Sequence, residues 1–219
     1  MRYPPLLIAL FTALTIKPLS DHFSKTVPAD IFLLLLFAAV IYAFRHRRRL
    51  VVWLALLGLG SMSARIVTIP SQQDNLYIIG HGLAFLLMVI VLVAILGEVL
   101  RTRTVTTDLV VGAVCLYFVI GLSWAFLYYW IYLISPGSIF VAPLATTYLP
   151  GSPAVETRFV EVIYFSLSCL TTLGSSGEET VTTMVRQLAV VESVMGQLYL
   201  AVLVSRLVGF STSSSDVSV

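Results

Sequence analysis

The 219-residue chain is strongly apolar, with 58 % hydrophobic and 11 % charged residues and a mean hydropathy of +0.98. An ordinary soluble domain has about 45–50 % apolar and about 25 % charged residues, so this composition excludes a soluble enzyme and a disordered chain. Thirteen basic and eleven acidic residues give a net charge of +2, which is too balanced for a nucleic-acid-binding protein. We therefore expect an all-α membrane protein, surrounded by lipid, with no nucleic acid among its partners.

Six apolar segments separated by short polar breaks predict six transmembrane helices. A spanning helix needs about 20 apolar residues, a length that the last four segments reach and the first two approach. The segments cover approximately residues 5–19, 29–44, 50–69, 76–100, 109–134 and 184–209.

A seventh apolar stretch, residues 159–173, lies between the fifth and sixth predicted spans. It is short and includes Glu161 and several hydroxyl side chains. Such a segment is too short and too polar to cross a bilayer, but its length is typical of a re-entrant helix that enters and leaves on the same side. The predicted fold is therefore six transmembrane helices with a re-entrant pore helix and filter loop between helices five and six.

The basic residues predict the orientation of the chain. With the N-terminus inside, eight of the 13 Lys and Arg residues lie on the inner side, and the Arg45–Arg49 loop carries most of this excess. We expect an integral protein of the plasma (inner) membrane with both termini in the cytoplasm. Residues 1–20 alternatively form a cleaved signal peptide, which leaves the remaining topology unchanged.

The sequence lacks the usual motifs of cofactor and metal sites, such as a phosphate-binding loop, a CxxC pair or HExxH. Cys115 and Cys169 both lie in apolar segments, where small buried residues are common. Residues 174–177 match the Gly-x-Ser-Gly motif of rhomboid-type intramembrane proteases, but no histidine follows Ser176 to act as its base. We expect no enzymatic activity, no cofactor, and no metal beyond permeant ions.

The residues that follow the short seventh segment have the chemistry of a cation path. The C-terminal end of a helix carries partial negative charge, small residues allow backbones to approach an axis, and paired carboxylates concentrate cations. The candidate ion path comprises Thr171, Thr172, Leu173, Gly174, Ser175, Ser176 and Gly177, and the candidate outer acidic ring comprises Glu178 and Glu179.

The last third of the chain resembles the pore module of the tetrameric potassium-channel superfamily. The sequence Tyr164-Phe165-Ser166 and the sequence Leu170–Gly174 are similar to that family's pore helix and filter. Residues 188–209 resemble the inner helix, and residues 104–124 the outer helix, of the prokaryotic two-pore-helix ion-channel family. The resemblance implies a homotetramer that passes monovalent cations, with divalent ions as further candidates at the acidic ring.

This resemblance also divides the chain into three parts. Residues 1–103 would form a four-helix transmembrane domain in the position of a voltage sensor, residues 104–210 the pore domain, and residues 211–219 a disordered tail. Residues 76–100 contain no Lys or Arg, so we expect little intrinsic voltage dependence. His81 in this segment is either a pH sensor or a hydrogen-bonding partner of a neighbouring helix.

The filter departs from the family after Gly174. The family has Tyr-Gly-Asp where this chain has Ser175-Ser176-Gly177-Glu178. Either Ser176 replaces the second filter glycine, or one serine is inserted and Gly177 is that glycine; in both alignments the filter tyrosine is absent. The predicted function is a potassium-channel-like cation channel that is weakly potassium-selective or non-selective; the alternative is a non-conducting or regulatory pore-fold membrane protein.

Two residues of the predicted inner helix have candidate roles. Gly196 is either a gating hinge or a close helix-packing contact. Glu192 is an acid inside an apolar segment, a position that indicates a functional role. The family resemblance implies that Glu192 forms a buried polar pair behind the filter.

Overall fold

The computed structural model describes residues 3–12, 38–44, 46–71, 74–102, 106–135, 138–139, 153–174 and 182–215. The backbone of these residues forms helices and no β-strand, as predicted. The five long helices are α3 (Arg48–Ser71), α4 (Asp74–Arg101), α5 (Thr107–Ile134), α6 (Pro153–Leu170) and α7 (Thr183–Ser215). Residues 4–12 and 38–44 are also helical.

Three helices within this described part are long and apolar enough to cross a membrane. They are Asn75–Arg101 in α4, Thr107–Ile134 in α5 and Thr183–Arg206 in α7. This finding supports a membrane protein. The helix α3 coincides with the third predicted span, whereas residues 13–37, which hold parts of the first two, lie outside the described residues. Six spans therefore remain a prediction.

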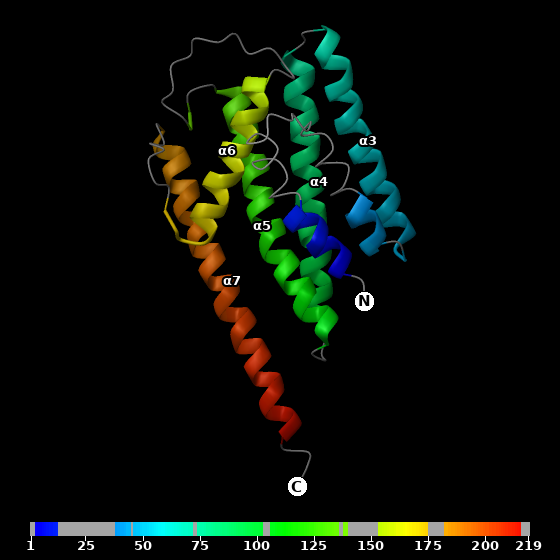
Figure 1. Cartoon of the computed structure of the whole chain (residues 1–219), viewed down its shortest axis with the longest axis vertical. Coiled ribbons are helices and arrows are strands. Elements are labelled where there is room, and N and C mark those ends of the chain that lie inside the picture. The colour runs from blue at the N-terminus through cyan, green and yellow to red at the C-terminus, as the bar shows by residue number, and fades with distance from the viewer. Residues whose placement is uncertain are drawn as a thin grey trace.

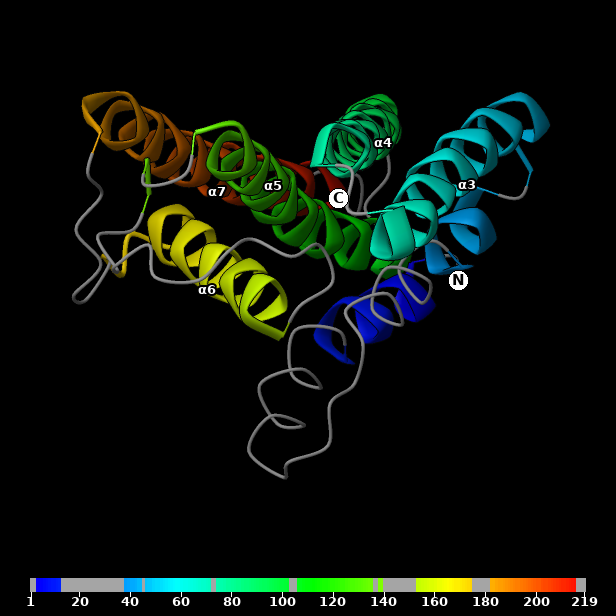
Figure 2. The same ribbon diagram turned by 90° about the horizontal axis from the view of Figure 1, so that it is seen from above.

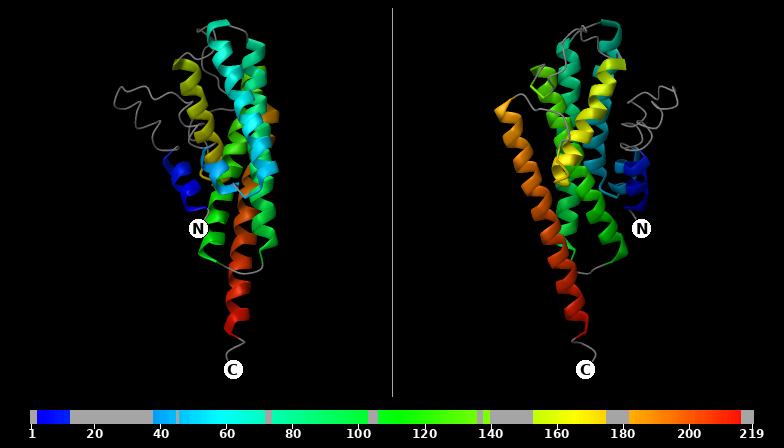
Figure 3. Two further views of the ribbon diagram at one scale, coloured as in Figure 1. Left: turned by 90° about the vertical axis from the view of Figure 1, so that its right-hand side faces the viewer. Right: turned by 60° about the vertical axis from the view of Figure 1, so that its left-hand side comes forward.

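The helices α3, α4 and α5 form an antiparallel row (Figure 1). Seen from above, α3 and α4 lie on one side of α5, and α6 and α7 lie on the other (Figure 2). The start of α3, the end of α4, the start of α5 and the end of α7 all lie toward one end of the molecule (Figure 3). This arrangement follows from short connections between long apolar helices, which favour antiparallel neighbours.

Large buried aromatic side chains hold α6 against α5. Tyr128 of α5 meets Phe165 of α6 edge to face, with ring centroids 5.2 Å apart. Phe159 packs between Phe126, to which its ring is tilted, and Tyr129, which it meets edge to face, at centroid distances of 5.3 and 5.0 Å. Each such pair contributes about 0.5–1.5 kcal/mol beyond the burial of its surface. These contacts fix the position of α6.

The helix α6 ends half-way along its two neighbours, as Figure 1 shows. A Cβ atom on Gly121, the fifteenth of 28 residues in α5, would lie 2.7 Å from Leu167 and 3.1 Å from Leu170. Leu170, the last residue of α6, also contacts Gly196, the fourteenth of 24 residues in the α7 span. By Thr182 the chain has returned to the end of α5, because the Thr182 hydroxyl donates to the Ser138 carbonyl oxygen at 3.1 Å.

The helix α7 continues into the segment that was predicted to be a disordered tail. Residues 211–215 continue α7 as helix, and residues 216–219 lie outside the described part. The reason is helical cooperativity: once a long helix has formed, adding a residue costs no new nucleation, and serine is only moderately unfavourable.

Candidate functional site

The candidate site begins where α6 ends. Residues 171–174 are non-helical and exposed, and the Leu173 side chain is 75 % exposed. Thr172 has φ = +57° and Gly174 has φ = +81°, so two of these four residues adopt the left-handed backbone region. Left-handed geometry is ordinary for glycine and uncommon for threonine, which marks this turn as constrained by its surroundings.

Neighbouring helices hold the C-terminal end of α6 through hydroxyl groups. The Tyr117 hydroxyl of α5 donates to the Leu170 carbonyl oxygen at 3.2 Å. The Ser193 hydroxyl of α7 donates to the Cys169 carbonyl oxygen at 2.7 Å. The last carbonyl groups of a helix lack intrahelical partners, so these bonds satisfy them and fix where residues 171–174 begin.

A second polar contact lies one turn further back in α6. The Ser166 hydroxyl oxygen lies 2.7 Å from the Gly121 carbonyl oxygen and 2.5 Å from Oε1 of Glu192. Ser166 and Glu192 are both completely buried. The structure thus shows a buried polar contact of Glu192, formed with Ser166 of α6.

Sequence reasoning placed seven residues in the candidate ion path, and the structure describes four of them. Thr171, Thr172, Leu173 and Gly174 form the continuous turn at the end of α6. The remaining candidate residues lie outside the described part of the chain: Ser175, Ser176, Gly177, Glu178 and Glu179. Their roles in the ion path and in the acidic ring stay predictions.

Gly196 makes a close backbone contact. A Cβ atom there would collide with the Leu170 carbonyl oxygen and lie 3.0 Å from the Leu170 side chain. This geometry agrees with the helix-packing alternative for Gly196. The hinge alternative stays a prediction, since a single conformation does not test it.

Most of α7 is apolar and uncovered. In the most apolar 18-residue stretch of the candidate span Thr183–Arg206, only 11 % of the residues are buried. The exposed large apolar side chains of this helix are Met184, Val190, Val191, Val194, Met195, Leu198, Leu200, Val202 and Val204. This surface passes beside the candidate site, where the Gln197 amide lies 3.4 Å from the Thr172 hydroxyl.

His81 lies outside this site. Its Nδ1 atom lies 3.0 Å from the Tyr77 carbonyl oxygen, and its ring contacts the rings of Tyr77 and Tyr129 at centroid distances of 4.3 and 5.0 Å. His81 is therefore part of the α4–α5 packing.

Tyr117 and Ser193, which hold the end of α6, were missed by sequence reasoning. The available signal was weak: each is a hydroxyl residue within an apolar segment, and a buried hydroxyl needs a hydrogen-bond partner. Many other hydroxyl groups in this chain meet that description, so the sequence does not select these two.

The described residues define a helical protein with candidate membrane spans and one helix that ends at the middle of two of them. No protein-family model, no curated protein and no solved structure matches this chain.

Proposed function

We propose that this chain forms a homotetrameric, potassium-channel-like cation channel with an altered filter. In this proposal, α5 is the outer helix, α6 is a re-entrant pore helix, residues 171–177 line the ion path and α7 is the inner helix. The channel is weakly potassium-selective or non-selective, because Ser175 and Ser176 lack the aromatic ring that braces the filter in the family it resembles.

One observation carries the proposal: non-helical backbone lies exposed at the middle of two candidate spans. Residues 171–174 leave the helical state beside Gly121 and Gly196, near the midpoints of α5 and of the α7 span. Irregular backbone at membrane depth is tolerated only where protein buries it or where it lines a water-filled cavity. Lipid does not supply hydrogen-bond partners for the exposed backbone groups of this turn, whereas water in a path between copies of the chain does.

The uncovered surface of α7 supports assembly around an axis. A single chain offers one re-entrant turn, whereas an ion path lined by backbone carbonyl groups needs several copies. Closed rotational symmetry is the usual form of homo-oligomers, and it would bring the α7 surfaces of the copies toward one axis. Four copies are the number implied by the resemblance.

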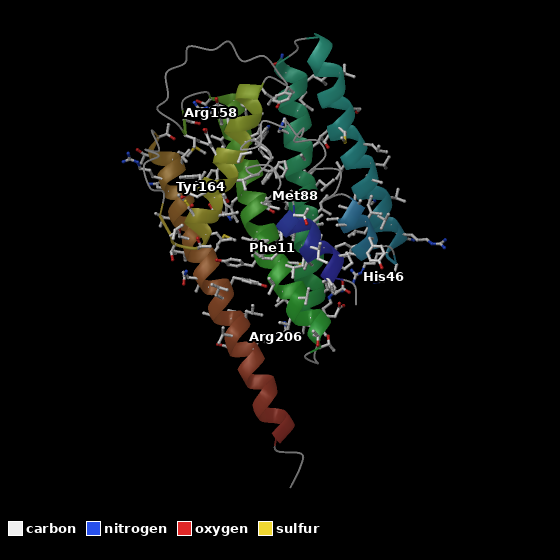
Figure 4. The ribbon with its side chains drawn as sticks, in the orientation of Figure 1. Phe11, His46, Met88, Arg158, Tyr164 and Arg206 are labelled. Atoms are coloured by element: carbon white, nitrogen blue, oxygen red, sulfur yellow. The ribbon has the colours of Figure 1, made fainter. Side chains whose placement is uncertain are left out.

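The basic residues support the proposed orientation. Arg48 begins α3, Arg101 ends α4 and Arg206 lies in the last third of α7, all toward one end of the molecule (Figure 1). Figure 4 shows Arg206 toward this end and Arg158 at the opposite one. The positive-inside rule places the end with more basic residues in the cytoplasm. We propose a location in the plasma (inner) membrane.

The test measures cation flux across the membrane of liposomes that contain the purified full chain. Flux is compared before and after a thiol reagent modifies a cysteine introduced at the turn. Leu173→Cys places a thiol at the exposed turn, and a positively charged thiol reagent should then reduce potassium and sodium flux at least several-fold. The matched control is Val93→Cys, an exposed position on α4, where the same reagent should leave flux unchanged. Cys115 and Cys169 are buried, which limits background reaction.

Two results would contradict the proposal. Flux that responds equally to both modified cysteines would place the ion path elsewhere. No flux of any cation from a correctly assembled tetramer would instead favour the non-conducting alternative. Strong potassium preference would contradict only the selectivity part, and would mean that the two serines support a filter of fixed width.

A further inference from the structure

Glu192 is a carboxyl group buried inside an apolar helix. It is 0 % exposed and lies in α7 at the contact with α5 and α6. Among the described residues no Lys, Arg or His forms an ion pair with it. The titratable groups around it are Tyr117 and Tyr128 of α5 and Cys169 of α6, none of which supplies positive charge.

A second proton would make both close contacts of the Ser166 hydroxyl group full hydrogen bonds. A serine hydroxyl has one proton to donate and two lone pairs with which to accept. Ser166 Oγ lies at hydrogen-bond distance from two oxygen atoms, the Gly121 carbonyl at 2.7 Å and Glu192 Oε1 at 2.5 Å. The Gly121 carbonyl oxygen accepts only, so the assignment that makes both contacts hydrogen bonds gives it the serine proton. The contact with Glu192 is then a hydrogen bond only if the carboxyl group donates.

Two further buried polar atoms belong to the same cluster. Tyr128 Oη and Glu192 Oε2 are buried, and neither has a hydrogen-bond partner among the described residues. The Tyr128 hydroxyl lies next to the Glu192 carboxyl group. If the acid proton is on Oε1, Oε2 is a carbonyl oxygen that accepts, and the Tyr128 hydroxyl is the donor available to it. An ionised carboxylate at this site would be buried without a compensating cation, which is costly.

We propose that Glu192 is a neutral carboxylic acid that donates to Ser166 Oγ and, through it, fixes α6 to α5 and α7. Glu192 Oε1 then donates its proton to Ser166 Oγ, and Ser166 Oγ donates its own to the Gly121 carbonyl oxygen. Glu192 is a positioning residue, because it acts through Ser166. This proton site is independent of the proposed channel activity.

Infrared spectroscopy of the purified full chain at neutral pH tests the proton directly. A protonated carboxylic acid has a carbonyl stretching band that an ionised carboxylate lacks. Glu192→Gln should remove this band. Glu161→Gln is the matched control, because Glu161 lies in α6 and is ion-paired with Arg158 at 2.8 Å; this change should leave the band in place. A spectrum in which Glu192→Gln removes no band overturns the proposal.

Stability measurements test the positioning role separately from conduction. Glu192→Gln keeps a side-chain donor for Ser166 and should retain the thermal unfolding midpoint of the parent protein. Glu192→Ala removes the donor and should lower it by several degrees. If the glutamine variant does not fold, Ser166→Ala provides the second measurement: it removes the acceptor and should shift the acid band. An unshifted band, or equal loss of stability in the glutamine and alanine variants, would contradict the positioning role.

Discussion

The guanidinium group of Arg206 in α7 donates a hydrogen bond of 2.6 Å to the carbonyl oxygen of Val99 in α4. Its second nitrogen donates to the carbonyl oxygens of Leu100 at 3.1 Å and Thr102 at 2.6 Å. These carbonyl groups lie at the C-terminal end of α4, where they lack intrahelical N–H donors. The partial negative charge of this helix end also favours a nearby cation. One side chain thus connects α7 to the end of α4, across the predicted boundary between the pore domain and the four-helix domain.

Replacing Arg206 should therefore destabilise the folded chain. Arg206→Gln removes the charge and most of the donors, and a hydrogen bond to a charged group contributes about 1.5–3 kcal/mol. We expect a loss of about 2–3 kcal/mol in detergent unfolding experiments, with Arg206→Lys intermediate because its ammonium group reaches fewer carbonyl oxygens at once. Arg186→Gln, at the other end of α7, is the control. Equal effects of the two glutamine variants would show that helix charge alone matters.

The close contact at Gly196 gives a second prediction. Gly196→Ala would press a methyl group against the Leu170 carbonyl oxygen and should destabilise the protein by about 1–3 kcal/mol, the usual cost of overpacking. Gly97→Ala in α4 is the matched control, since a Cβ atom there has no neighbour within 4 Å. That change should be neutral or stabilising by up to about 1 kcal/mol. Thermal unfolding of both variants measures these changes in stability. An unchanged unfolding midpoint for Gly196→Ala would show that α6 and α7 separate easily.

Length and composition were sufficient to predict the long helices. The apolar segment at 109–134 became α5 over Thr107–Ile134, and the segment at 76–100 became α4 over Asp74–Arg101. The prediction succeeded there because a continuous apolar run of this length has few alternatives to a helix. At residues 211–219 composition indicated disorder, and the helix α7 extends into this segment as far as Ser215.

The contacts that position the candidate site could not be predicted in the same way. The capping of α4 by Arg206 joins residues more than 100 positions apart, and sequence alone indicated only a basic residue near a helix end. The sequence likewise does not indicate which small residues contact α6. Gly121 and Gly112 both occur in α5, yet Gly121 contacts Leu167 and Gly112 contacts Tyr3. Such pairings depend on how the helices rotate against each other.

Membrane topology can be tested by cysteine labelling. The predicted orientation places residue 47 in the cytoplasm and residue 149 outside. Arg47→Cys should therefore react with a membrane-impermeant thiol reagent only after the inner side is opened, and Leu149→Cys should react in intact cells. The native cysteines are buried and serve as the unreactive background. Reaction of both introduced cysteines from the same side would contradict the six-span topology.

The last prediction concerns the acidic pair Glu178 and Glu179, which lie outside the described residues. In a tetramer these residues bring up to eight carboxylates to the mouth of the path, where they would attract cations and bind divalent ions through carboxylate oxygens. Joint substitution by glutamine should reduce cation flux and abolish divalent block at low ionic strength. The effect should shrink as salt rises, because salt screens exposed charges over about 8–10 Å.

A comparison at several salt concentrations separates this role from ordinary solvated charges. The measurement is flux through liposomes with and without a divalent cation, for the parent chain and for the double glutamine variant. Glu161→Gln serves as the control for losing an acidic side chain outside the proposed ring, because Glu161 lies in α6 and is paired with Arg158. A functional ring predicts a change for the double variant alone, largest at the lowest salt. If flux and divalent block are the same in all three proteins at every salt concentration, Glu178 and Glu179 are solvated loop residues and the acidic ring is absent.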